Sequence, residues 1–170
     1  SAFLSKDRCA SFSRTDISSD KIFIAPRVYT SSDGSYRLFT SASVNDLFYI
    51  YYSESKDGKN WTAFKQFEPC QGMRNPFVPF QKSVFGGDLV VFQAYYSSSV
   101  TNRLSYQLYS TFTSDGGKNW TTPVLLTDQA SFPSSEKRDF ANFQNQRPFL
   151  YYYGGELYLA WERMEAVSAA

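Results

Sequence analysis

The strongest constraint on the fold is a short motif that occurs twice in the chain. Residues 55–62 (SKDGKNWT) and residues 113–121 (TSDGGKNWT) are nearly the same sequence, and their tryptophans, Trp61 and Trp120, lie 59 positions apart. The second stretch fits the pattern Ser/Thr-x-Asp-x-Gly-x-x-Trp, whereas the first has one residue fewer between its aspartate and its tryptophan. Repetition at this spacing indicates a chain built from copies of one structural unit.

The sequence around the motif repeats as well. Three stretches, which begin at Pro26, Pro76 and Pro148, each contain an apolar run, a glycine-containing turn and a second apolar run. This arrangement is typical of a β-hairpin. In the first two units a third apolar segment follows, at residues 47–53 and 104–112, and then come the motif and a short fourth strand. Each complete unit is therefore predicted to be a four-stranded antiparallel sheet, which at this period is typical of a propeller blade.

The repeats predict an all-β chain with about two and a half blades. The expected boundaries are residues 24–70 and 74–128 for two full blades and residues 145–170 for an incomplete third, which loses its outer strands after Trp161. Residues 1–23 are expected to be a lead-in segment or a strand of another blade. Two and a half blades cannot close a ring, and an open blade leaves a sheet edge and an apolar face exposed. We therefore expect the rest of the propeller, or another chain, to complete the assembly.

The motif itself is predicted to stabilise the turn between the third and fourth strands. Its aspartates are expected to accept backbone N–H groups across the turn, as Asx-type residues do. Its glycines permit a positive φ, and its tryptophans are expected to pack beneath the turn. The residues assigned this structural role are Ser55, Asp57, Trp61, Thr113, Asp115, Gly117 and Trp120.

Over residues 24–163 the chain resembles the Asp-box family, also called BNR repeats, which is best known from sialidases. The resemblance implies a six-bladed β-propeller in a complete member, with the ligand over the central axis and the Asp-boxes away from it. Two functions follow as hypotheses, because the family also includes non-catalytic domains. One is a propeller that binds or hydrolyses glycans containing sialic acid, as an exo-glycosidase whose site needs further blades. The other is a non-catalytic, exported scaffold for protein contacts or adhesion.

The resemblance also suggests site residues. Sialidases of this kind hold a carboxylate with three arginines and use a tyrosine nucleophile, backed by a glutamate, with an aspartic acid–base. Arg27 and Arg147 are expected at corresponding places at the starts of blades, Arg74 is shifted by a residue or two, and Asp46 lies in the loop that matches the acid–base. Arginine suits this task because its planar guanidinium pairs with a carboxylate through two hydrogen bonds. The alternative is that these arginines make ordinary contacts between blades and that Asp46 is a turn residue.

The nucleophile and its glutamate have no assignment, because the family's copies come from later blades. The segment alone is therefore expected to lack sialidase activity.

Composition narrows the remaining possibilities. The chain has no histidine, which excludes Ser-His-Asp and Cys-His nucleophile systems and His-ligated metal sites if the chain acts alone, and no metal or cofactor is expected. A net charge of +1 and a charged fraction of 19% do not indicate a basic surface that binds nucleic acid. No apolar run is long enough to insert into a membrane. The sequence leaves two interpretations of Cys9 and Cys70, a disulfide or two free thiols. The resemblance implies a secreted, periplasmic or cell-surface location.

Overall fold

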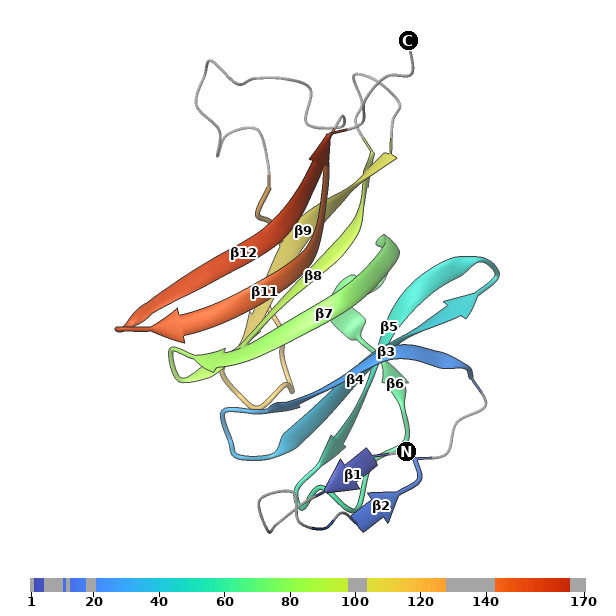
Figure 1. Cartoon of the computed structure of the whole chain (residues 1–170), viewed down its shortest axis with the longest axis vertical. Helices are drawn as coiled ribbons and strands as arrows, with labels where there is room; N and C mark the ends of the chain where they lie inside the picture. The colour runs from blue at the N-terminus through green and yellow to red at the C-terminus, as the bar shows by residue number, and fades with distance from the viewer. Residues whose placement is uncertain are drawn as a thin grey trace.

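The computed structural model describes residues 2–4, 11, 13–17, 21–97, 104–127 and 143–165. These residues form an all-β fold of antiparallel sheets, none of which closes on itself (Figure 1). The only helical element in this part of the chain is a single 3₁₀ turn at Glu68–Cys70. Within the same residues no helix has the length and apolarity needed to cross a bilayer. The prediction of an all-β chain with antiparallel sheets is therefore confirmed.

Two sheets have four strands each, in simple sequence order. The first sheet consists of β3 (Phe23–Thr30), β4 (Tyr36–Val44), β5 (Leu47–Ser55) and β6 (Lys65–Gln66). The second sheet consists of β7 (Arg74–Val84), β8 (Gly87–Ser97), β9 (Leu104–Thr113) and β10 (Val124–Leu125). Short turns join β3 to β4, β4 to β5 and β7 to β8, which is the arrangement that the repeated hairpin pattern predicts.

Two further pairs of strands are shorter assemblies. The third sheet is the hairpin of β11 (Phe143–Tyr153) and β12 (Glu156–Glu165). A small antiparallel pair is formed by β1 (Ala2–Leu4) and β2 (Ser13–Thr15). In Figure 1 this pair lies at the opposite end of the molecule from the third sheet.

The second sheet is buried on both faces between the other two. Strands β3, β4 and β5 contact β7 on one side, and β11 contacts β7, β8 and β9 on the other. Along β8, Val90, Phe92 and Ala94 pack toward the first sheet, whereas Leu89 and Val91 belong to the cluster shared with the third sheet. This alternation follows from the period of two in a β-strand, and it makes the central sheet the centre of the core.

The first strand of each sheet carries the same irregularity. The pairing shifts at an X-Pro step in β3, β7 and β11, where the residue before the proline has a left-handed φ: 51° at Ala25, 52° at Asn75 and 51° at Arg147. A bulge of this kind inserts unpaired residues and bends the strand. Because the bulge occurs at one place in each first strand, it gives a structural alignment of the three sheets that does not depend on side-chain identity.

Candidate functional site

The candidate binding arginines lie on the first strands: Arg74 begins β7, whereas Arg27 and Arg147 lie inside β3 and β11, each four residues after the strand's first residue. The end of the sheets at which the first strands begin carries the turn between β4 and β5 with Asp46, because antiparallel neighbours place alternate turns at opposite ends. The Asp-boxes, residues 55–62 and 113–121, lie at the other end with the turns between first and second strands. Arg27 nevertheless pairs with Phe39, which pairs with Tyr52, three positions before the first Asp-box, so only part of a strand separates Arg27 from that motif.

The bulge alignment corrects the expected equivalence of the arginines. Arg147 is the left-handed residue of its bulge and aligns with Ala25 and Asn75, not with Arg27. Arg27 follows its bulge by one position, and Arg74 precedes its own. The prediction that Arg27 and Arg147 occupy corresponding places is therefore wrong by two residues, because the prolines, and not the arginines, mark the repeat.

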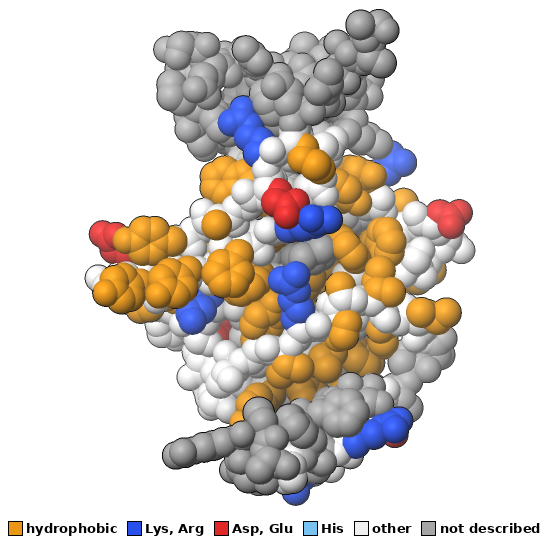
Figure 2. Space-filling model, viewed as in Figure 1, with side chains coloured by type: hydrophobic (Ala, Val, Ile, Leu, Met, Phe, Trp, Pro, Cys, Tyr) orange, Lys and Arg blue, Asp and Glu red, His pale blue; other side chains and the backbone are white. Residues whose placement is uncertain are grey.

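Each arginine has its own environment. The guanidinium of Arg27 lies over the ring of Phe80, 5.8 Å from its centroid. The side chain of Arg147 is 68% exposed and donates from Nη1 to both carboxylate oxygens of Glu162, at 3.0 Å each. Arg74 is exposed at the start of β7. On the face shown in Figure 2, Lys and Arg side chains stand as separate groups among hydrophobic ones, without forming one continuous basic patch among the described residues.

Asp46 occupies a two-residue hairpin turn. Asn45 and Asp46 both have a left-handed φ, 51° and 62°, and Val44 pairs with Leu47 across the turn. Two consecutive left-handed residues define a type I′ turn, in which Asn and Asp are favoured. An aspartate at position 46 is thus explained by the turn, and equally by the acid–base role that the resemblance implies.

An open groove of about 580 Å³ runs along the three first strands. It is lined by residues of β3, β7 and β11, among which Tyr29, Phe80, Phe149 and Tyr151 supply aromatic rings. Burial raises the pKa of Tyr29, and its hydroxyl donates to the carbonyl of Pro79 at 3.2 Å. Tyr29 is therefore a neutral hydrogen-bonding and packing residue.

The two Asp-boxes have matching aspartate geometry. Asp57 Oδ1 accepts the backbone N–H groups of Lys59 and Asn60 at 2.8 Å each. Asp115 Oδ1 does the same with Lys118 and Asn119, at 3.0 Å each. These hydrogen bonds hold the pKa of both carboxyl groups well below the usual range, because they favour the ionised form. Both aspartates therefore remain acceptors for their own turns, as predicted from the motif.

The other motif residues complete the turns. The hydroxyls of Ser55 and Thr113 donate to the aspartate Oδ1, at 3.0 and 2.7 Å, and accept an N–H group from Gly58 and Gly117. The indole N–H of each tryptophan donates to a glycine carbonyl three residues earlier, at 3.2 Å for Trp61 and 3.1 Å for Trp120. The polar groups of the motif are used within the turn, which leaves it no evident catalytic group.

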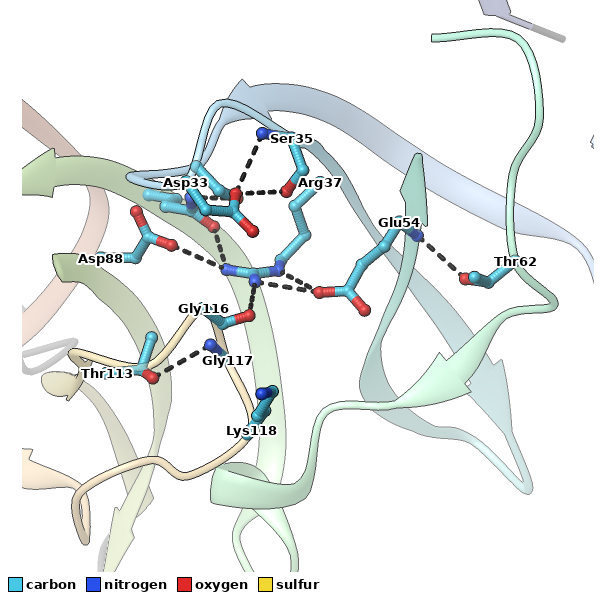
Figure 3. A network of polar contacts seen from close by, with 12 residues as sticks. Asp33, Ser35, Arg37, Glu54, Thr62, Asp88, Thr113, Gly116, Gly117 and Lys118 are labelled. Atoms are coloured by element: carbon cyan, nitrogen blue, oxygen red, sulfur yellow. Dashed lines mark hydrogen bonds and ion pairs between the residues drawn. The ribbon is translucent and has the colours of Figure 1, made fainter. Parts of the chain in front are cut away.

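Sequence reasoning missed the most buried charged cluster, which is centred on Arg37 of β4 (Figure 3). The side chain of Arg37 is fully buried and extends from the first sheet into the second. Its Nη1 donates to Gln81 Oε1 at 3.0 Å and to Asp88 Oδ2 at 3.4 Å. Its Nε and Nη2 donate to Glu54 Oε1 at 3.1 and 2.9 Å. Arg37 is therefore a charged link between two sheets, satisfied on all sides.

The second Asp-box takes part in this cluster. Arg37 Nη2 donates to the carbonyl of Gly116 at 3.0 Å, and the guanidinium lies 5.3 Å from the ring centroid of Trp120. A Cβ at Gly117 would lie 2.5 Å from Arg37 Nη2, and Gly117 has a φ of 90°. Only glycine meets both requirements. The glycine of the motif thus makes room for an arginine 80 residues earlier in the chain.

A second cleft, of about 480 Å³, lies between the two Asp-boxes. Its lining residues carry both signs of charge: Asp33, Glu54 and Asp57 are acidic, and Lys56 and Lys118 are basic. The described residues contain no group of three or more His, Cys, Asp or Glu side chains that could hold a metal ion. Cys70 is a free thiol buried in the core, and Cys9 lies outside the described residues.

No protein-family model, curated protein or solved structure matches this chain.

Proposed function

We propose that this chain is an arc of an Asp-box β-propeller of about six blades, which binds an acidic sugar, of the sialic acid class, at the end where its first strands begin. The observation that carries the proposal is that β3, β7 and β11 each place an arginine within two residues of the same proline bulge. Stacked sheets bring the starts of their first strands to one end of the molecule. Arginines there favour a carboxylate ligand.

The ion pair of Arg147 is compatible with this role. Both Arg147 and Glu162 are more than half exposed, so their interaction is screened by water and contributes little to stability. A ligand carboxylate can therefore compete for the guanidinium at small cost. The aromatic groove along the first strands offers flat, partly polar surfaces of the kind on which sugars stack.

The Asp-boxes have a structural role in this proposal. The hydrogen bonds of their aspartates close within the turns, and the motifs lie at the opposite end of the strands from the turn that holds Asp46. We place the protein outside the cytoplasm, as the family resemblance implies, and expect further sheets to complete the site. The chain alone is then expected to bind weakly and to hydrolyse no sialoside.

Binding of 3′-sialyllactose, with lactose as the neutral control, tests the proposal. Titration calorimetry or ligand-observed NMR should show preference for the acidic sugar. Arg27→Ala and Arg147→Ala should each weaken its binding by about 1.5 to 3 kcal/mol, the value of a charge-assisted hydrogen bond. Arg14→Ala is the matched control, because Arg14 of β2 is exposed and pairs with Asp16, which directly follows that strand. Equal affinity for the two sugars, or arginine variants that unfold without a change in affinity, would contradict the proposal.

A second candidate function is a non-catalytic scaffold for protein contacts. The observation that favours it is the type I′ turn, which accounts for Asp46 without any acid–base role. Asp46→Asn keeps the turn and removes the titratable group, so it separates the two functions. A sialidase assay on the completed assembly should lose turnover in this variant if Asp46 is the acid–base, and a wild-type assembly without turnover favours the scaffold.

A further inference from the structure

Both Asp-boxes end in the same tripeptide, which the motif pattern does not require. Residues 60–62 and 119–121 each read Asn-Trp-Thr, whereas the pattern Ser/Thr-x-Asp-x-Gly-x-x-Trp leaves open the residues on either side of the tryptophan. The sequence Asn-x-Thr, with x other than proline, is the acceptor signal for N-linked glycosylation in exported proteins. None of the other asparagines of the chain is followed two positions later by Ser or Thr. The signal therefore coincides with the Asp-boxes and occurs nowhere else in the sequence.

The structure places both asparagines where a glycan has room. Asn60 and Asn119 are exposed and lie in the turns between the third and fourth strands of the two complete sheets. An N-linked glycan is bulky and hydrophilic and is accommodated at a protein surface. A glycan on either side chain would extend from the turn into solvent, so its attachment does not disturb the core.

The hydrogen bonds of the two amides are compatible with glycosylation. Asn60 Nδ2 donates to Asp57 Oδ2 at 2.7 Å, and Asn119 Nδ2 donates to Asp115 Oδ2 at the same distance. A side-chain amide carries two N–H groups, and an N-glycosidic bond replaces only one of them. The second N–H group of each amide has no hydrogen-bond partner among the described residues. A glycosylated asparagine can therefore remain a donor to the aspartate of its own Asp-box.

The threonines of the signal also have a place in the fold. Thr62 Oγ1 accepts the backbone N–H of Glu54 at 3.0 Å (Figure 3), and Thr121 Oγ1 accepts that of Phe112 at 2.9 Å. Glycosyl transfer to asparagine takes place while the chain is being exported, before such hydrogen bonds form. The same hydroxyl can therefore serve the acceptor signal first and the turn afterwards.

We propose that Asn60 and Asn119 are acceptors of N-linked glycans. The proposal rests on the location outside the cytoplasm proposed above and does not depend on sugar binding. The donor is an oligosaccharide on a lipid pyrophosphate carrier. The bond between its C1 atom and the pyrophosphate oxygen breaks, a bond from C1 to the asparagine Nδ2 forms, the amide loses one proton, and the lipid pyrophosphate leaves.

Glycans at these positions give the two ends of the sheets different surfaces. Both acceptors lie at the end that carries the Asp-boxes, and Asn60 lines the cleft of about 480 Å³ between the two motifs. A glycan on Asn60 would therefore stand over that cleft. The opposite end, with the turn that holds Asp46, would remain uncovered.

Mass spectrometry of the full chain tests the proposal, after expression in insect or mammalian cells behind a cleavable signal peptide. The unchanged chain should carry two N-linked glycans. Asn60→Gln and Asn119→Gln should each lose the mass of one glycan, and the double variant should carry none. Digestion with peptide N-glycosidase should convert both acceptors to aspartate. Asn45, which is also exposed but lies outside any signal, should stay unmodified.

A matched pair of variants separates the acceptor signal from the stability of the turn. Thr62→Ser keeps both the hydroxyl and the signal and should keep the glycan on Asn60, whereas Thr62→Val should lose it. Secreted chains and chains retained in the lumen are both analysed, because transfer precedes folding and a misfolded variant still reports occupancy. An unchanged chain that carries no glycan in either pool, or a glycan that persists in the double variant, would overturn the proposal.

Discussion

The two Asp-boxes have nearly the same sequence and the same internal hydrogen bonds, but they differ in their surroundings. The first one, residues 55–62, has its hydrogen bonds within its own turn and the adjoining strand. The second, residues 113–121, also contacts the neighbouring sheet through Arg37 and through Trp120, whose ring packs against Phe67 at 5.0 Å. The comparison teaches that the shape of such a turn is set locally, whereas its contribution to stability depends on the sheet beside it.

The largest loss of stability should follow from changing Arg37, which connects the second Asp-box to the first sheet. Arg37→Ala leaves the buried Asp88 without its cation, and breaking a buried ion pair costs about 3 to 5 kcal/mol. Urea unfolding measures the loss. Replacing both partners, as in Arg37→Met with Asp88→Leu, should recover much of it, because the uncompensated charge is gone. A loss below about 1 kcal/mol for Arg37→Ala would show that the link is energetically unimportant.

Truncating the two tryptophans should reveal a smaller difference in stability between the two Asp-boxes. Trp120→Ala removes a ring from the core between the first and second sheets and should cost about 3 kcal/mol, the lower end of the range for aromatic truncation, since the ring is only partly buried. Trp61→Ala, at the matched position outside this core, should cost about 1 kcal/mol. Thermal or urea unfolding of the two variants gives the comparison directly. Equal losses would mean that the neighbouring sheet adds nothing to the motif.

The smallest effect, and the one in which the Asp-boxes should agree, is the pH dependence of the aspartates. Folding depresses both pKa values, so their stabilisation is full above the unfolded value near 4 and is lost as the pH falls toward the folded values. Asp57→Asn and Asp115→Asn should each flatten the decline in unfolding free energy below about pH 4. The flattening should be equal, because the hydrogen bonds are local in both turns. A much larger effect at Asp115 would show coupling to the Arg37 cluster.

The features that sequence reasoning predicted correctly are local ones. The hairpin turns and the hydrogen bonds of Asp57 and Asp115 depend on residues within a few positions, so a short window contains the information. Arg37 was missed because its partners Gln81, Asp88 and Gly116 lie 44 to 79 residues away and no local pattern marks them. The nearest signal was an arginine at an inward position of an apolar strand.

The candidate binding end was predicted only in outline. Matching arginines aligned Arg27 with Arg147, whereas the bulge aligns Pro26 with Pro148 and so moves Arg147 to the position of Ala25. A two-residue error keeps the side chains on the same face of a strand but moves them along it, so it changes which residues can meet a common ligand.

The position of Arg37 has a consequence for how the molecule unfolds. In many repeat proteins each unit contributes nearly independently, and the ends can fray before the centre. Here Arg37 of the first sheet donates hydrogen bonds to Gln81, Asp88 and Gly116 of the second sheet. Separating the two sheets therefore exposes an apolar interface and leaves the Asp88 carboxylate without its cation in one step. The two sheets should therefore melt as one cooperative unit, and the third sheet, which is tied to the second mainly by aliphatic contacts and amide hydrogen bonds, is the part free to detach first.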